Sequence, residues 1–168
     1  MLSKIGASFF VITCVVLAGC VGSTFANRTI EEDLLFVASE DIISEANALV
    51  EFLDRKSVSY ARIEFDELSA YNGSVKHIVV FLGMDNREMA EVASEVLSPE
   101  DFEWLKEEDS NSIFVSEDVW NSEQWVMVFG GENMPLAVDG LDYFRDQWVA
   151  QIAGWFNLPL TSKELYSY

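Results

Sequence analysis

Cysteine is missing from most of this chain. The two that occur, Cys14 and Cys20, both lie within the first 20 residues. The remainder can therefore hold no disulfide framework, no cysteine-ligated metal and no nucleophilic thiol. Histidine is almost as scarce, since His77 is the only one. A histidine metal cluster and an H-E-x-x-H zinc site are excluded, and we expect His77 to have a structural or surface role.

Positive charge is also scarce. Ten Lys and Arg stand against 29 Asp and Glu, which gives a formal net charge of −19. Such a field repels nucleic acid and anionic lipid headgroups, so we expect no nucleic-acid partner. The excess of acids has two interpretations that stay open: a solvated, highly soluble surface, or a face that binds cations.

Charge of either sign is missing between Lys4 and Arg28. A basic start, an apolar middle and small residues at the end form the pattern of an export signal. The run contains Leu17-Ala18-Gly19-Cys20, which resembles the lipobox of lipoproteins. The resemblance implies cleavage before Cys20 and attachment of lipid to its thiol, because small residues let the peptidase approach the backbone.

Two other fates of this segment stay open. At ~1.5 Å per residue the uncharged run is long enough to cross a ~30 Å hydrocarbon core uncut. Cleavage after Ser23-Thr24-Phe25-Ala26 would instead release a secreted protein. We expect residues 1–27 to be a signal peptide or membrane anchor, and residues 28–168 to form one acidic extracytoplasmic domain. The predicted location is the cell membrane, with the membrane and other envelope proteins as partners.

The pattern of apolar residues in the body alternates between helix-like and strand-like segments. The period predicts a helix over 30–54, where Ile30, Leu34, Val37 and Ala38 recur at three and four. Further helices are expected after Asn86, after Ser98 and over 136–156, and strands over 58–65, 77–82, 113–115 and 124–129. This order predicts an α/β fold: a single layered domain with a small, largely parallel sheet flanked by helices.

Two apolar strands, each ending in glycine, form a paired pattern: Ile78-Val79-Val80-Phe81-Leu82-Gly83, and Val126-Met127-Val128-Phe129-Gly130-Gly131-Glu132 with Ala137 beyond. Over residues 58–150 this pattern resembles the α/β domain of archaeal S-layer-like proteins and cell-surface lipoproteins. The first strand of that family tends to end in two glycines, whereas Met84 follows Gly83 here. The resemblance implies a non-enzymatic envelope module and carries over no catalytic residues.

The ends of these strands are where α/β proteins bind ligands. Neither end has a G-x-G-x-x-G or G-x-x-x-x-G-K sequence, and Asp85 and Glu132 place negative charge where a phosphate would lie. The glycines are therefore expected to serve tight turns, and no cofactor or metal site is predicted. Trp120 and Trp125, which flank a polar loop, could form an exposed aromatic platform.

Asn27 and Asn72 are candidate glycosylation sites, because each begins an N-x-S/T sequence. The sequence as a whole predicts a non-enzymatic, envelope-anchored surface protein with a structural or assembly role. The main alternative is an extracytoplasmic lipoprotein that binds a cation or a small solute. A hydrolase that uses paired carboxylates is a third interpretation.

Overall fold

A five-stranded sheet forms the centre of the protein. The computed structural model describes residues 32–165, so the predicted anchor, with Cys20 and Asn27, lies outside the described residues. The strands are β1 (Leu34–Val37), β2 (Tyr60–Ile63), β3 (His77–Gly83), β4 (Asn111–Glu117) and β5 (Trp125–Gly131). Their order is β2-β1-β3-β5-β4, and every pairing is parallel except that of β4 with β5. The predicted α/β fold class is confirmed.

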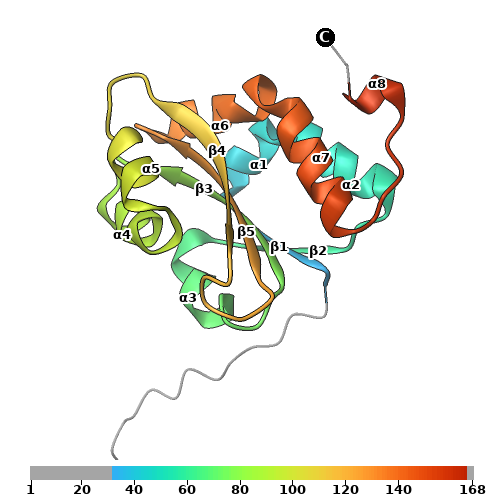
Figure 1. Cartoon of the computed structure of the whole chain (residues 1–168), viewed down its shortest axis with the longest axis horizontal. Helices are drawn as coiled ribbons and strands as arrows, with labels where there is room; N and C mark the ends of the chain where they lie inside the picture. The colour runs from blue at the N-terminus through green and yellow to red at the C-terminus, as the bar shows by residue number, and fades with distance from the viewer. Residues whose placement is uncertain (1–31, 166–168) are drawn as a thin grey trace, which may run out of the picture.

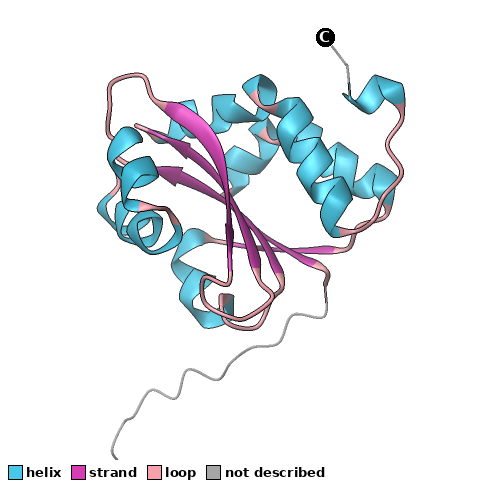
Figure 2. Cartoon of the chain, viewed as in Figure 1, coloured by secondary structure: helices cyan, strands magenta, loops and turns pink. Residues whose placement is uncertain are grey.

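Helices cover both faces of the sheet (Figures 1 and 2). The first face carries α1 (Glu40–Glu45), α2 (Asn47–Lys56), α6 (Met134–Tyr143) and α7 (Arg145–Trp155). The second face carries the turn η1 (Phe65–Glu67), α3 (Leu68–Tyr71), α4 (Arg87–Val96) and α5 (Pro99–Trp104). A last short helix, α8 (Ser162–Leu165), lies near α2, where Lys56 Nζ is 2.9 Å from Glu164 Oε1. No helix of the described residues is long and apolar enough to span a membrane.

The three inner strands are apolar on both sides, as expected where helices cover a parallel sheet on both faces. Successive side chains of β1, β3 and β5 alternate between two cores, one under each helical layer. Trp148 is the largest fully buried side chain, and its Nε1 donates to the carbonyl of Leu141 at 2.9 Å. Gln124 is also fully buried; its Nε2 donates to the carbonyls of Asn72 and Val75, and its Oε1 accepts from the Trp120 amide.

The helix predicted over residues 30–54 is wrong in its first part. Residues Leu34–Val37 form β1, and the helical residues after it are divided between α1 and α2. The reason is burial on both faces, since all four residues of β1 are at most 1% exposed. A surface helix would have placed two of them off its apolar stripe. The apolar residues Leu35 and Phe36 lie outside the helical stripe, and they indicate a strand.

The helix predicted over 136–156 is divided in the structure. It begins earlier, at Met134, and it breaks at Phe144, where the backbone turns to φ −110° and ψ 25°. The apolar stripe continues from Leu141 to Trp148 across the break, so periodicity alone could not locate it. The predicted helix starts at Asn86 and Ser98 are confirmed: each side chain accepts a hydrogen bond from an amide in the first turn of its helix.

Of the strand-end glycines, Gly83 begins a tight turn, as predicted, because its carbonyl accepts from the Asn86 amide at 3.2 Å. The glycines end β3 and β5, and no glycine of the described residues has a positive φ. Gly83 and Gly131 also allow close packing. A Cβ on Gly83 would lie 2.6 Å from the amide nitrogen of Met134, and one on Gly131 would lie 2.5 Å from that of Ala137. The first turn of α6 therefore rests directly on the ends of both strands.

Candidate functional site

The carboxyl ends of β1 and β3 form the topological switch point of the sheet. After β1 the chain turns to α1 on the first face, and after β3 it turns to α4 on the second face. Because the two connections leave in opposite directions, a crevice remains between the strand ends. Open parallel sheets bind their ligands at this position.

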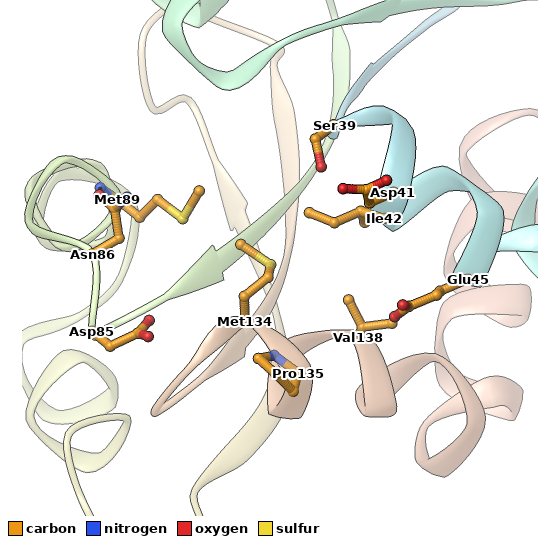
Figure 3. A pocket seen from close by; sticks show the side chains of 10 residues that line it. All are labelled: Ser39, Asp41, Ile42, Glu45, Asp85, Asn86, Met89, Met134, Pro135 and Val138. Atoms are coloured by element: carbon orange, nitrogen blue, oxygen red, sulfur yellow. Dashed lines mark hydrogen bonds between the residues drawn. The ribbon is translucent and has the colours of Figure 1, made fainter.

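A cleft of about 480 Å³ occupies this crevice. Three helices and the segments that lead into them supply its walls (Figure 3). The lining residues are Ser39, Asp41, Ile42 and Glu45 from the α1 side, Asp85, Asn86 and Met89 from the α4 side, and Met134, Pro135 and Val138 from α6. The volume lies within the ~300–1,000 Å³ that is common for small-molecule sites.

Apolar side chains form the inner surface of the cleft. Met89 from α4 and Met134 from α6 point toward each other across it, and Ile42 and Val138 lie on the α1 side (Figure 3). Met134 is held by the close packing of α6 on Gly83, and by Asn133, whose side chain accepts from the Leu136 amide at 3.1 Å. Methionine side chains adapt their shape to an apolar ligand with little strain.

Carboxylates surround this apolar surface. Asp41 and Glu45 extend from α1, and Asp85 faces Asp41 from the opposite wall (Figure 3). Within residues 32–165, none of these three carboxylates forms a hydrogen bond or an ion pair, and no Lys or Arg is among the lining residues. Three unpaired negative charges around one cleft favour a positively charged ligand.

The arrangement fits an organic cation better than a metal ion. No three His, Cys, Asp or Glu side chains of the described residues lie close enough together to hold a metal. The helix end at α4 is also occupied, because Asn86 Oδ1 accepts from the amides of Glu88 and Met89 at 2.9 and 3.2 Å. An anion would therefore meet both a filled helix end and the carboxylates.

His77 lies at the opposite, amino edge of the sheet, as the first residue of β3. Its ring lies against those of Trp155 and Phe156, with centroids 5.2 and 4.7 Å away, and its Nδ1 is 3.2 Å from the carbonyl of Asp33. Burial lowers the pKa of His77 below its usual value. These contacts agree with the predicted structural role.

The aromatic platform predicted for Trp120 and Trp125 is wrong. Both side chains are partly buried, and Trp120 packs against the second core while its Nε1 donates to Glu95 Oε2 at 3.1 Å. Asn72, a predicted glycosylation site, is half-buried in the turn after α3. Its modification stays a prediction.

The sequence had indicated the β3 and β5 ends of the site but not its α1 wall. Asp85 lines the cleft, while Glu132 lies beside a neighbouring hollow and accepts from the Asp109 amide at 2.9 Å. Asp41 and Glu45 were missed because β1 was predicted as helix, which left no strand end next to them. The four-residue apolar run of β1, followed by Ser39 and two acids, was the available signal.

Comparisons with known proteins give no family. The chain matches no protein-family model, and neither a curated protein nor a solved structure matches it significantly.

Proposed function

We propose that this chain is a non-enzymatic protein of the cell envelope, anchored by its N-terminal segment, and that its cleft binds a small organic cation. The observation that carries the binding role is the cleft at the switch point. It combines three unpaired carboxylates, Asp41, Glu45 and Asp85, with an apolar inner surface.

The lining defines the class of ligand. Carboxylates select an ammonium or guanidinium group, because a charged hydrogen bond between opposite charges is the strongest polar contact that a partly exposed site can offer. Ile42, Met89 and Met134 favour a ligand that also has an alkyl or aromatic part. The expected ligand is an amine of this kind.

The absence of a catalytic arrangement in the cleft supports a binding role. Ser39 is the only hydroxyl among the lining residues described, and no His, Lys or Cys accompanies it. Nucleophilic catalysis by serine requires an adjacent base, and His77 lies at the far edge of the sheet. Paired carboxylates would be the remaining route to catalysis.

The position of the cleft is compatible with anchoring. The chain enters the sheet at the amino end of β1, and the cleft lies at the carboxyl ends of the same strands. An attachment at Cys20 would therefore join the domain at the edge opposite the cleft. The lipobox resemblance at Leu17-Ala18-Gly19-Cys20 and the uncharged run around it support this attachment.

Calorimetry on the purified full-length chain, kept in a mild detergent, tests the binding role. We expect heat with phenethylamine or spermidine, and none with benzoate or calcium chloride. Asp85→Asn should weaken amine binding about tenfold, whereas Asp146→Asn, on the exposed start of α7, should leave it unchanged. Binding of calcium alone, or no heat with either amine, would contradict the proposal.

Membrane fractionation and mass spectrometry test the anchor separately. The wild-type protein should be recovered with membranes and should begin at a lipid-modified Cys20. Cys20→Ala should abolish the modification. An unmodified, intact N-terminus in a soluble fraction of wild-type cells would overturn this part of the proposal.

A structural or assembly role at the cell surface is a second candidate. The resemblance of residues 58–150 to S-layer-like domains supports it. One feature of the fold, the free edge of β4, favours it independently.

A further inference from the structure

The two lateral edges of the sheet differ in how they are protected. At one edge, β2 has only four residues and carries Arg62. At the other, β4 has seven residues, no charge from Asn111 to Ser116, no proline, and an unbroken register with β5. Although α6 packs against β4 on one face, no strand of the described residues pairs with its outer edge (Figure 2). Long, uncharged edge strands are rare on monomers because they pair with other chains.

The hydrogen-bond pattern defines which backbone groups of β4 are free. The carbonyl of Ser110 accepts from the Glu132 amide, and the amide of Asp118 donates to the carbonyl of Gln124. In an antiparallel pair, residues that bond to the partner strand alternate with residues whose backbone groups point away from it. The even-numbered residues of β4 therefore bond to β5. The amides and carbonyls of Asn111, Ile113, Val115 and Glu117 therefore point away from the sheet.

The side chains of β4 are nearly symmetric about Phe114. The sequence Ser112-Ile113-Phe114-Val115-Ser116 has serine at both ends and a β-branched residue on each side of the ring. In an antiparallel pair centred on Phe114, Ile113 of one copy opposes Val115 of the other, and both have outward-facing backbone groups. Serine opposes serine and Phe114 opposes itself. Matched cross-strand pairs of this kind stabilise a sheet.

Exposed apolar side chains gather at the same edge. Of the large apolar residues that the structure describes, three are exposed: Trp104, Val115 and Tyr143. Val115 lies on β4 and is 38% exposed; Trp104 is 40% exposed and meets Phe114 edge to face, with ring centroids 6.4 Å apart. Two of the three thus lie where a second copy would cover them.

We propose that two copies of this chain associate through β4, in an antiparallel pair centred on Phe114, to form one continuous sheet. The two-fold axis makes the contact isologous, so each copy offers the same strand and the assembly closes as a dimer. Trp104 and Phe114 of both copies lie on one face of the extended sheet, and Ile113 and Val115 on the other. The proposal is independent of the ligand cleft.

The charges at the ends of β4 make this association dependent on salt. Glu107, Glu108 and Asp109 precede the strand, and Glu117 and Asp118 end it or follow it. In the antiparallel pair the end of one strand lies beside the start of the other, so these acids approach one another. The Debye screening length falls from about 10 Å at 0.1 M salt to about 3 Å at 1 M. Added salt therefore weakens the repulsion between these acids and should strengthen the dimer.

Sedimentation and amide hydrogen exchange on the full-length chain in a mild detergent test the proposal. We expect a dimer that tightens between 0.1 and 1 M NaCl, and slower exchange at Ile113 and Val115 as the dimer forms. Val115→Pro removes an outward-facing amide and no bond to β5, so the monomer should fold while the dimer weakens about tenfold or more. Val115→Thr, which keeps the amide, should dimerise like the wild type. So should Tyr143→Thr, which removes an exposed side chain on another element.

Three results would overturn the proposal. The first is a chain that stays monomeric at every salt and protein concentration. The second is a dimer in which the β4 amides exchange freely, or one that Val115→Pro does not weaken, since the contact would then lie elsewhere. The third is protection of β4 only after addition of a peptide with an apolar centre and lysines at both ends. That outcome would identify a different occupant of this edge.

Discussion

The packing of α6 on the ends of β3 and β5 can be tested at Gly131. An ideal Cβ at this position would lie 2.5 Å from the amide nitrogen of Ala137, 2.9 Å from the carbonyl oxygen of Asn133 and 2.9 Å from the carbonyl carbon of Leu136. All three atoms belong to the backbone at the start of α6. No rotation of a side chain can relieve the contact, so the helix itself must move.

The size of the effect follows from this geometry. Ordinary contact begins near 3.4 Å, so Gly131→Ala must displace the first turn of α6 by roughly 1 Å. Overpacking of a well-packed interior costs about 1–3 kcal/mol of unfolding free energy. Met134 and Val138 line the cleft and move with the helix, so amine binding in the cleft should weaken as well.

Gly154→Ala is the matched control. Gly154 lies near the end of α7 with nothing within 4 Å of the added carbon, and it is exposed. The same substitution there should stabilise the protein by about 0.5–1 kcal/mol, because alanine is the better helix residue. Urea unfolding of the full-length chain, followed by tryptophan fluorescence, measures both. If Gly131→Ala stayed within about 0.5 kcal/mol of the wild type, the close packing of α6 would be refuted.

Three further substitutions test the interior and the charge contacts. Gln124→Leu leaves two carbonyls and one amide without partners, so it should lower the unfolding free energy by about 3 kcal/mol or more in the same urea assay. A loss below about 1 kcal/mol would contradict the buried hydrogen-bond network. Burial lowers the pKa of His77, so the unfolded state binds the proton first as the pH falls below about 6.5. The wild type should therefore lose more unfolding free energy than His77→Gln between pH 7.5 and 5.5. Equal losses in the two proteins would refute this. Hydrogen bonds from Thr161 and Lys56 lower the pKa of Glu164 to about 2, so its stabilising contribution should be complete above about pH 4.5 and disappear as the pH falls toward 2. A carboxyl titration by NMR with a midpoint near 4.5 would contradict this, and Glu164→Gln should remove the dependence.

The sequence was sufficient for the elements that obey one period and carry clear end signals. The short apolar runs of β3 and β5, each ending in glycine, were correctly predicted as buried strands, and Asn86 and Ser98 located two helix starts. β1 was missed because two of its four residues, Leu34 and Val37, also fit a helical stripe that continues into α1 and α2. A short apolar pattern within one segment does not show whether the segment is buried on one face or on two. That difference depends on helices further along the chain that pack against the strand.

The same limit explains what was missed in the site. Asp85 could be placed at a strand end because β3 was recognised, but Asp41 and Glu45 belong to the end of a strand that was not. The close packing at the glycines could not be predicted either. Gly83 and Gly131 are needed because α6 packs on both strand ends. Gly83 and Met134, which meet there, are about 50 residues apart in the sequence, so only the fold brings them together.

The fold separates three tasks by placing them on different sides of one sheet. The chain enters at the amino edge beside His77, the cleft lies at the carboxyl edge, and β4 forms one lateral edge. In the antiparallel β4 pair the two-fold axis is perpendicular to the sheet, so the cleft of one copy lies at the same edge of the extended sheet as the chain entry of the other copy. Because strand pairing leaves the strand ends uncovered, association through β4 and binding in the cleft can occur together.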